Sequence, residues 1–594
     1  MNALMQLRIW IGIIVIGTLS VSCAASSEDD STMADLVLLN GNVITVDGDF
    51  SYAEAFAIRD EEFIAVGSNE DVQDYIGNQT SIIDADGKTV IPGLIESHVQ
   101  ATAAARNEAV QPFLQLGSIS EIQEWLQNEV QNRPAGEWIR LPRADVTRIR
   151  EGRIPYPEEL DAAAPEHPAV FIWQFADQQT QVLNSAAMEA AGITSQTSVP
   201  EGGRMYLDED GEPTGVLENS GELTEEYLSI PEVSQEEHLF KLEELLGLYN
   251  KVGITSVYER NGSPEAYQLF NQLKQDGRLT TRVMVTINLS SDGTLEGTER
   301  VIRSMPLRYR DGDDWVHVGP LMIRADGGIL YGTAFMQEPY GVDAAAFYGF
   351  EDPNNRGSLL IGDDELWNLL FTGHRMNWPM AVHVTGDAGV DAVLDVFDSL
   401  RESIPGSSDL RPTLIHAYFP NPEAAERVAE LGVGVDTQTA WYYKDGDALS
   451  NVLGSERIEK FIGLRTWKDA SVNIALNSDH MQGFDPNRSL NPYNPFLTMY
   501  TAITRKTEGG QVFGQHHQIS REDAIRMMTI DAAWLNFEEE RKGSIETGKL
   551  GDFAILSEDF LTCEEEKIRE IHSQLTVVGG NIVYEAPGFT SRQR

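Results

Sequence analysis

Four apolar segments of the chain each end in side chains that can bind a metal ion or move a proton. Residues 90–100 read VIPGLIESHVQ and end with His98 and Gln100, and residues 380–387 read MAVHVTGD and carry His383. Residues 413–416 end in His416, and residues 474–480 read IALNSDH, with Asp479 near the end. The whole chain contains only 11 histidines. Imidazole nitrogens and a carboxylate at matching places on separate strands are typical of a site for a divalent transition metal.

The chemistry that this set supports is hydrolysis. A divalent metal held by imidazoles lowers the pKa of bound water to about 7. Asp479 can bind the metal and also accept the proton of the water, and a nearby His or Arg can polarise a carbonyl group. The side chains therefore indicate cleavage of a C–N or C–O bond by water.

These side chains need strands that bring them to one place. Short apolar segments alternate with helical patterns from about residue 250 to residue 480, and this alternation is typical of a parallel βα barrel. Alternate residues of a strand face the same side, so His98 and Gln100 would both face the mouth at the carboxyl end of the barrel. We predict an α/β fold with a TIM-like (β/α)8 barrel over residues 91–544. Residues from about 105 to 245 fit the alternation poorly, and we predict that they form an inserted α+β lid domain.

Both ends of the chain are rich in strand patterns. Residues 34–46 read ADLVLLNGNVITV, in which runs of Val, Leu and Ile flank an Asn-Gly turn. Residues 548–556 and 574–584 show similar short apolar runs with glycine between them. We therefore predict a composite β-sandwich built from residues 34–90 and 545–586.

Composition and charge exclude several classes of protein. The chain has 594 residues, 41% of them hydrophobic, which is enough for a large core. Its 44 basic and 93 acidic residues give a formal charge of −49, so nucleic acid is not an expected partner, and the expected ligand is a small-molecule substrate. With only two cysteines, Cys23 and Cys563, a disulfide framework and a cysteine-based zinc cluster are excluded.

The N-terminus has the pattern of an export signal. Arg8 precedes a short apolar run that ends in Leu-Ser-Val-Ser before Cys23. This pattern predicts a lipoprotein-type signal peptide over residues 1–22, with Cys23 as the lipid acceptor, and a membrane-anchored protein of the bacterial envelope, on the periplasmic or outer-membrane side. A simple secretory signal, cleaved nearby without an anchor, is the alternative.

The motifs together resemble those of the amidohydrolase superfamily, in particular the amidohydrolase 3 branch that includes N-substituted formamide deformylases. The matching segments, in order, are IPGLIESHV, IRADGG followed by AFMQEPY, AVHVTGDAGVDAVLDVF, LIHA, ALNSDH and GSIETGKLGDFAIL. The resemblance covers residues 34 to 584. It implies a metal-dependent hydrolase with a TIM-like barrel, a composite sandwich and an inserted lid.

The resemblance also implies a role for each retained residue. His98 matches the first histidine of the strand-1 pair, His383 and His416 match the ligands of strands 5 and 6, and Asp479 matches the strand-8 ligand and general base. His416 would bind the metal or polarise the carbonyl.

Three positions depart from the family pattern. Gln100 replaces the second histidine of the pair, Met322 replaces the lysine expected four residues before Asp326, and residues 177–179, Asp-Gln-Gln, replace Asp-Gly-His. Glutamine offers only a weak neutral oxygen to a metal, and methionine cannot be carboxylated to bridge two ions. We therefore expect one divalent metal, zinc or a similar ion, and no binuclear site. Arg324 and Asp326 lie beside this gap and either help to fill it or form a structural ion pair.

Three hypotheses on function follow from these residues. The first is an exported mononuclear hydrolase that cleaves a non-peptide C–N bond in an amide, formamide or cyclic amide. The second is a non-catalytic or metal-free binding or sensory relative, which the three departures motivate. The third is a lyase or isomerase that uses the same His and Asp side chains as acid and base. Trp441, just after a barrel strand, either lines the substrate pocket or packs beneath the inserted domain.

Overall fold

A computed structural model describes residues 32–175, 178–228 and 231–589 of the chain. Cys23 and the proposed signal segment 1–22 lie outside the described residues. Among the described residues, no helix is long and apolar enough to cross a bilayer.

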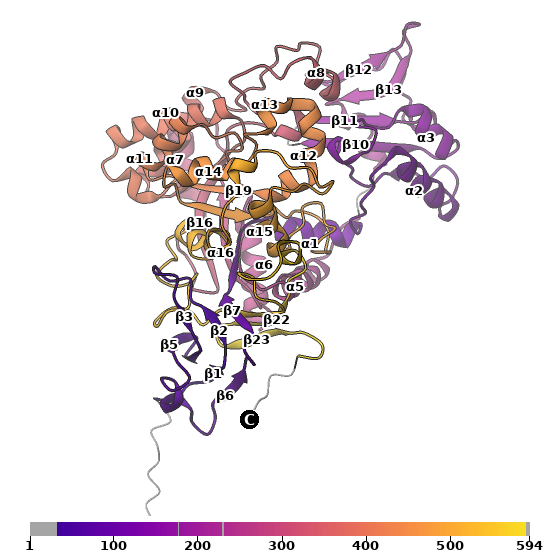
Figure 1. The fold of residues 1–594 in the computed structure, drawn as a ribbon. Coiled ribbons are helices and arrows are strands. Elements are labelled where there is room, and N and C mark those ends of the chain that lie inside the picture. Colours follow the sequence, from indigo (N-terminus) through magenta and orange to yellow (C-terminus); the bar gives the residue numbers. More distant parts are fainter. Residues whose placement is uncertain (1–31, 176–177, 229–230, 590–594) are drawn as a thin grey trace, which may run out of the picture.

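Eight parallel strands form a barrel in the centre of the molecule (Figure 1). In chain order they are β8 (Leu94–Val99), β14 (Ile254–Glu259), β15 (Arg282–Asn288), β16 (Val316–Arg324), β17 (Met380–Val384), β18 (Thr413–His416), β19 (Gly434–Gln438) and β20 (Ile474–Asn477). A parallel bridge between Val99 and His480 joins the last strand to the first and closes the ring. The strands are buried along nearly their whole length, as expected for parallel strands covered by helices. The prediction of a TIM-like α/β barrel is confirmed.

Helices cover the outside of the barrel. They include α5 (Gln235–Lys251), α6 (Pro264–Gln275), α7 (Leu295–Ser304), α9 (Asp363–Arg375), α10 (Asp387–Ser403), α11 (Pro422–Leu431), α12 (Thr439–Leu453), α14 (Leu464–Asp469), α15 (Pro495–Thr504), α16 (Arg521–Met527) and α17 (Ile530–Trp534). Several begin at a side-chain cap, for example Ser234 before α5 and Asn421 before α11, whose oxygens accept a backbone N–H of the first turn. The inner faces of these helices and the outer faces of the strands share one continuous apolar core.

Two further sheets combine the two ends of the chain. One has the strand order β5-β4-β1-β6, and the other has the order β23-β22-β21-β7-β2-β3. The strands are β1 (Leu36–Leu39), β2 (Asn42–Ile44), β3 (Tyr52–Ala53), β4 (Ala55–Arg59), β5 (Glu62–Gly67), β6 (Ser81–Asp84), β7 (Thr89–Pro92), β21 (Phe553–Leu556), β22 (Ser573–Val578) and β23 (Asn581–Glu585). The sheets share a core in which Phe56 packs edge-on against Phe63 and Phe553. This pairing places the N- and C-terminal strands together beneath the barrel (Figure 1).

A separate five-stranded sheet follows the first barrel strand and its helix α1 (Ala101–Val110). Its strand order is β12-β13-β11-β10-β9, with α2 (Ile119–Asn132), α3 (Pro157–Ala163) and α4 (Ser185–Ala190) packed on it. The strands are β9 (Ile139–Arg140), β10 (Ala169–Phe175), β11 (Gln178–Leu183), β12 (Arg204–Leu207) and β13 (Pro213–Glu218). This inserted domain projects to one side of the barrel (Figure 1). The chain then returns to the barrel through α5 and β14.

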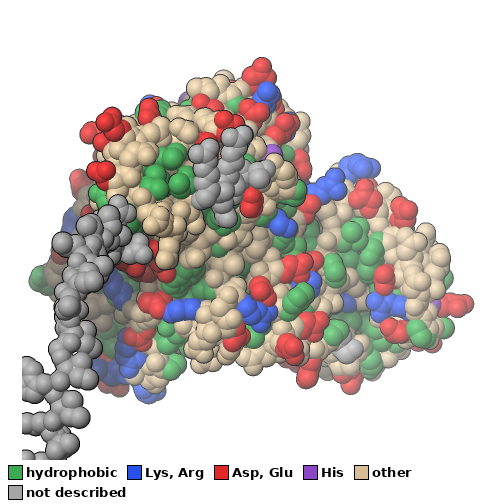
Figure 2. All heavy atoms as spheres, turned by 90° about the horizontal axis from the view of Figure 1, so that it is seen from below, with side chains coloured by type: hydrophobic (Ala, Val, Ile, Leu, Met, Phe, Trp, Pro, Cys, Tyr) green, Lys and Arg blue, Asp and Glu red, His purple; other side chains and the backbone are tan. Residues whose placement is uncertain are grey.

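The acidic side chains are spread over the surface. Figure 2 shows Asp and Glu scattered over the face that it draws, with Lys and Arg interspersed among them. Many of these groups form exposed ion pairs, such as Arg427 with Asp395 and Asp398 on α10. Exposed pairs of this kind contribute only about 0–1 kcal/mol each, so the charge influences solubility more than the fold.

Replacing His374 by Leu should remove part of the acid sensitivity of the fold. His374 lies near the end of α9, is 2% exposed, and has its Nδ1 2.9 Å from the carbonyl oxygen of Leu370. Burial lowers the pKa of His374 from 6.5 to about 4. The unfolded chain therefore binds this proton more tightly, and the stability of the wild type falls as the pH drops from 6.5 towards 4. At pH 5 the loss that depends on this histidine should be about 2 kcal/mol.

The measurement is the melting temperature of wild type and H374L at pH 7.5 and pH 5. We expect the wild type to lose more stability than H374L between the two values. The exposed His572 provides the matched control H572L, which should behave as the wild type. Equal pH dependence in the wild type and H374L would show that His374 does not contribute to acid unfolding.

Candidate active site

The predicted site residues meet at the carboxyl end of the barrel. His98 Nε2 lies 3.2 Å from Asp479 Oδ1. The ring centroid of His416 is 5.6 Å from that of His98 and 4.5 Å from that of His383. All four residues are at most 6% exposed. The structure thus gathers one carboxylate and three imidazoles from β8, β17, β18 and the segment after β20.

The backbone turns sharply at two of these residues. His416 has φ of +79° and Asp479 has φ of +54°, both in the left-handed region that residues other than glycine seldom adopt. The strand period would place His416 on the opposite face from Ile415, which packs inside the barrel with Met322 and Ala381. The positive φ at His416 instead turns its side chain toward the other two imidazoles. Left-handed residues of this kind are often found at functional sites.

Hydrogen bonds fix the His416 ring. Its Nδ1 lies 2.6 Å from Gln438 Oε1 and 2.8 Å from the Tyr418 hydroxyl. A carbonyl oxygen only accepts, so this contact favours a proton on Nδ1 and leaves Nε2 with its electron pair. Burial lowers the pKa of His416 to about 4, so the ring is neutral at physiological pH. Neither Tyr418 nor Gln438 was predicted. Gln438 is the last residue of β19, the strand beside His416, and this position at the end of a barrel strand could have indicated it.

Asp479 is held from several sides. The indole N–H of Trp441 donates to Asp479 Oδ2 over 3.2 Å. The side chain of Gln100 lies near the same carboxylate and contributes to lowering its pKa. Asn491 Nδ2 donates to the Asp479 carbonyl oxygen over 2.8 Å. Burial raises the pKa of Asp479 to about 7, although Trp441 and Gln100 lower it. Trp441 therefore lies at the site itself, and Gln100 lies near the carboxylate.

The remaining imidazoles differ in their surroundings. Burial lowers the pKa of both His98 and His383 well below 6.5, and repulsion from a protonated His416 would lower it further. Among the described residues, His98 Nδ1 has no hydrogen-bond partner although it is buried. Both ring nitrogens of His480, next to Asp479, instead have partners within the fold. Its Nε2 lies 2.7 Å from the Gly483 carbonyl oxygen, and its Nδ1 lies 2.7 Å from the Tyr249 hydroxyl.

Arg324 places a positive charge at the same mouth. It follows Met322 by two residues on β16 and so faces the same side of the strand, one step nearer the carboxyl end, beside His383 in the next strand. Its charge is among the causes that lower the pKa of His383 and His416. Asp326 has a structural role, because its buried carboxylate accepts N–H bonds from Thr385, Gly386 and Phe335.

The inserted domain contains residues 177–179, the third place at which the chain departs from the family pattern. Gln179 lies on β11, where its amide bonds to Gln174 over 3.3 Å and to Gln181 over 3.0 Å. These contacts lie within the inserted sheet. Asp177 is outside the described residues, as is the side chain of Gln178.

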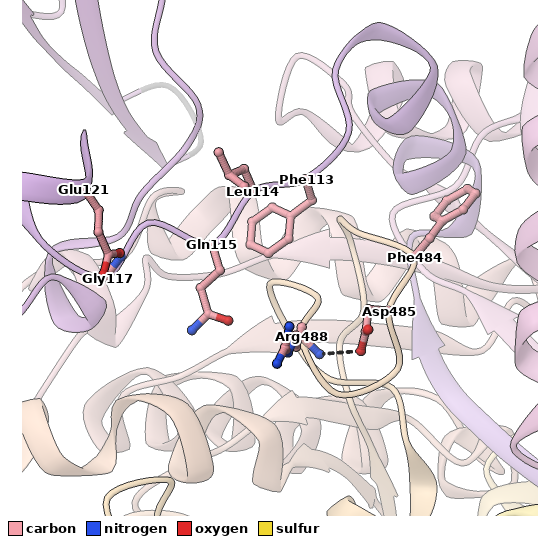
Figure 3. A pocket seen from close by; sticks show the side chains of 8 residues that line it. All are labelled: Phe113, Leu114, Gln115, Gly117, Glu121, Phe484, Asp485 and Arg488. Atoms are coloured by element: carbon pink, nitrogen blue, oxygen red, sulfur yellow. Dashed lines mark hydrogen bonds between the residues drawn. The ribbon is translucent and has the colours of Figure 1, made fainter. Parts of the chain in front are cut away.

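A cavity of about 580 Å³ opens beside the segments that follow β8 and β20. Figure 3 shows side chains that line it: Phe113 and Leu114 come from the stretch after α1, and Phe484 and Arg488 come from the loop after Asp479. The Arg488 backbone N–H donates to Asp485 Oδ1 over 3.0 Å. The cavity therefore joins an apolar wall to a charged one, at the same end of the barrel as the site.

The Amidohydrolase family model matches residues 81–584 of the chain. The chain belongs to the amidohydrolase family. The prediction from the sequence motifs is confirmed, and with it the prediction of a hydrolase. N-substituted formamide deformylase of Arthrobacter pascens is 26% identical over 562 residues, which is 94% of this chain and 99% of that protein. Protein LONG AFTER FAR-RED 3 of Arabidopsis thaliana is 26% identical over 565 residues, which is 93% of this chain and 92% of that protein.

Solved structures support the amidohydrolase fold. A metal-dependent hydrolase from Pyrococcus horikoshii matches with a TM-score of 0.64 and 19% identity, over 89% of this chain and 99% of the other. A metal-dependent hydrolase from Pyrococcus furiosus matches with a TM-score of 0.62 and 20% identity, over 89% and 100%. At this identity the likeness concerns the arrangement of the elements alone.

The side chains at the amidohydrolase site are of the types that bind a divalent ion. Their arrangement fits one such ion in part. The 3.2 Å between His98 Nε2 and Asp479 Oδ1 is close to the about 3.3 Å that separates two ligands of a tetrahedral zinc ion. Within the ranges that the structure describes, no three His, Cys, Asp or Glu side chains are grouped closely enough to hold a metal. Two of the donors are thus in place, and a third is not. Met322, at the position where the family pattern has a lysine, packs against Ala381 and Ile415.

Proposed function

We propose that this amidohydrolase cleaves a non-peptide C–N bond, in an N-substituted formamide or a related linear or cyclic amide. The observation that carries the proposal is the contact between His98 and Asp479 at the barrel mouth, with His416 and Arg324 beside it. The name of the Arthrobacter pascens relative supports the formamide class. The apolar wall of the neighbouring cavity, with Phe113 and Phe484, suits the organic substituent on the nitrogen.

In the proposed reaction Asp479 first accepts a proton from water and later donates it to the leaving nitrogen. The Asp479 carboxylate accepts a proton from water as the water oxygen bonds to the carbonyl carbon. Arg324 stabilises the negative charge that develops on the carbonyl oxygen. Asp479 then returns the proton to the nitrogen as the C–N bond breaks, which releases an amine and a carboxylic acid. Trp441 keeps the carboxylate oriented throughout.

We propose that one divalent ion, zinc, assists this reaction. His98 and Asp479 would hold it, with His383 and His416 as further ligands, and when bound it would supply a Lewis acid that makes water more acidic. Gln100 is the weaker donor, because a neutral amide oxygen competes poorly with imidazole for zinc.

Metal binding can be tested separately from turnover. We expect elemental analysis of protein purified without chelator to find about one metal ion per chain, and added zinc to raise the melting temperature. A ligand at 100 times its Kd stabilises the folded state by about 2.7 kcal/mol. The shift should disappear in H98A. It should remain in H572A, because His572 is exposed and lies far along the sequence from the residues of the barrel mouth. Absence of bound metal and of any zinc-dependent shift would contradict the metal part of the proposal.

The reaction is tested by incubating the protein with N-substituted formamides and measuring formate and free amine in equal amounts. N-acyl amines and cyclic amides extend the series. Formation of both products in a one-to-one ratio supports the proposal. Failure of all three amide classes with metal-loaded protein would exclude the proposed reaction.

A second candidate is a binding or sensory relative without hydrolytic activity. It is favoured by the arrangement of the described donors, of which only His98 and Asp479 lie at ligand-to-ligand distance. A thermal shift produced by an intact amide, without product formation, would support this candidate.

We also propose that the protein is exported and anchored through a lipid on Cys23. The support is the N-terminal pattern of a basic residue, an apolar run and a cysteine, all outside the described residues. Expressed in a bacterial host, the full chain should incorporate labelled palmitate and fractionate with membranes, and C23A should do neither. Equal incorporation in C23A would rule out this acceptor.

A further inference from the structure

We infer that Arg148 of the inserted domain is a positioning residue for Asp479. Arg148 ends the short 3-10 helix η3 (Val146–Arg148) and reaches into the barrel mouth, where two separate contacts connect it to the carboxylate. The inference rests on the proposed role of Asp479 as the base, and it assigns the inserted domain a part in the reaction.

A buried ion pair anchors Arg148 to the barrel. Its Nε donates to Asp445 Oδ1 over 2.9 Å, and its Nη2 donates to Asp445 Oδ2 over 2.8 Å. The arginine side chain is 10% exposed and the aspartate side chain is fully buried. Thr147 donates its hydroxyl proton to the same carboxylate over 2.7 Å. A two-pronged contact of this kind fixes the plane of the guanidinium as well as its position.

The first connection runs through Trp441. Trp441 and Asp445 are four residues apart on α12 and therefore lie on the same face of the helix. The Arg148 guanidinium carbon lies 5.3 Å from the centroid of the Trp441 ring, within the range of a cation–π contact. The indole N–H of that ring donates to Asp479 Oδ2 over 3.2 Å. Arg148 thus holds the ring whose N–H orients the carboxylate.

The second connection runs through Asn491. Arg148 Nη2 donates to Asn491 Oδ1 over 3.2 Å, and Asn491 Nδ2 donates to the Asp479 carbonyl oxygen over 2.8 Å. Arg148 Nη1 also donates to the carbonyl oxygen of the adjoining Leu490. Asp479 has the left-handed φ of +54°, which needs support from its surroundings. One guanidinium therefore supports both the side chain and the backbone of Asp479.

The inference predicts an effect on the chemical step more than on substrate binding. Loss of Arg148 frees Trp441 and Asn491 together, so that the carboxylate loses its fixed orientation while the cavity wall remains. A displacement of about 1 Å at a catalytic group can cost about 100-fold in rate. We expect kcat to fall about 100-fold, with KM changed by no more than a few-fold.

The test variant replaces both members of the ion pair, R148M/D445N, since removing Arg148 alone leaves a buried charge and endangers folding. R148K is a second variant that keeps the charge but not the two-pronged contact, and its kcat should lie between those of R148M/D445N and the wild type. The control is R133M, since Arg133 makes ion pairs with Glu129 and Glu137 inside the inserted domain. Wild-type kcat in both R148M/D445N and R148K would overturn the inference.

A spectroscopic measurement keeps the inference testable even if the protein hydrolyses none of the amides. The near-ultraviolet circular dichroism of the wild type minus that of W441F gives the signal of Trp441 in its fixed setting. This signal should be lost in R148M/D445N and kept in R133M. If it persists in R148M/D445N, Arg148 does not position Trp441 and the inference fails, whatever the outcome for the proposed reaction.

Discussion

Replacing Asp479 by Asn should lower kcat for amide hydrolysis by about 10²- to 10⁴-fold. The amide has nearly the shape of the carboxylate and can still accept the N–H of Trp441, but it cannot take a proton from water. Stopped or continuous measurement of formate release from an N-substituted formamide gives the rate. The substitution tests the assignment of Asp479 as the base more directly than any change to the imidazoles.

The matched control is D398N, because Asp398 lies on the exposed side of α10 and pairs only with surface arginines. D398N should retain the wild-type rate, and D479N should retain the wild-type near-ultraviolet spectrum. A D479N protein that hydrolyses amides at the wild-type rate would show that another group activates the water.

Replacing Asp436 by Ala should destabilise the protein by about 3–5 kcal/mol. Asp436 lies on β19, fully buried, with its Oδ2 2.9 Å from Nη2 of Arg260, which is 1% exposed. Ser97 and Asn477 also donate to this carboxylate. The truncation would leave the Arg260 charge inside the barrel without a counterion. The expected result is a large fall in melting temperature, measured by calorimetry or fluorescence.

Two variants separate this effect from a general loss of packing. R260M/D436L removes both charges and should be much closer to the wild type than D436A, because replacing a buried ion pair by apolar side chains is often neutral. D398A breaks an exposed pair and should cost no more than about 1 kcal/mol. If D436A has the same melting temperature as the wild type, the charge of Arg260 is balanced by other groups.

Most of the barrel strands were predictable because they are short apolar runs with a polar side chain at or near the carboxyl end. The positions of His98, His383 and Asp479 followed from that pattern and from the family motifs. The orientation of His416 could not be predicted in this way, because it depends on a positive φ that departs from the alternation of a regular strand. Only the folded chain shows that the ring points toward the other imidazoles.

The contacts around Asp479 were less predictable. Trp441 was considered either for the pocket or for packing, and the structure shows an indole N–H bonded to the carboxylate. Asn491 and Arg148 were missed because they come from an irregular loop and from the inserted domain, where no periodicity marks which side chains face the site. Nothing in the local sequence reveals that two residues 343 positions apart, Arg148 and Asn491, share a hydrogen bond.

The bridge between Val99 and His480, which closes the barrel, has a consequence for how the protein gains activity during synthesis. The contact between His98 and Asp479 joins residues 381 positions apart, so it cannot form until the last strand has been made and the ring has closed. Pairings of such high contact order form late and slowly, because the entropy of closing a long loop must be overcome first. A nascent or truncated chain that ends before β20 would therefore contain most of the barrel and His98, but not Asp479.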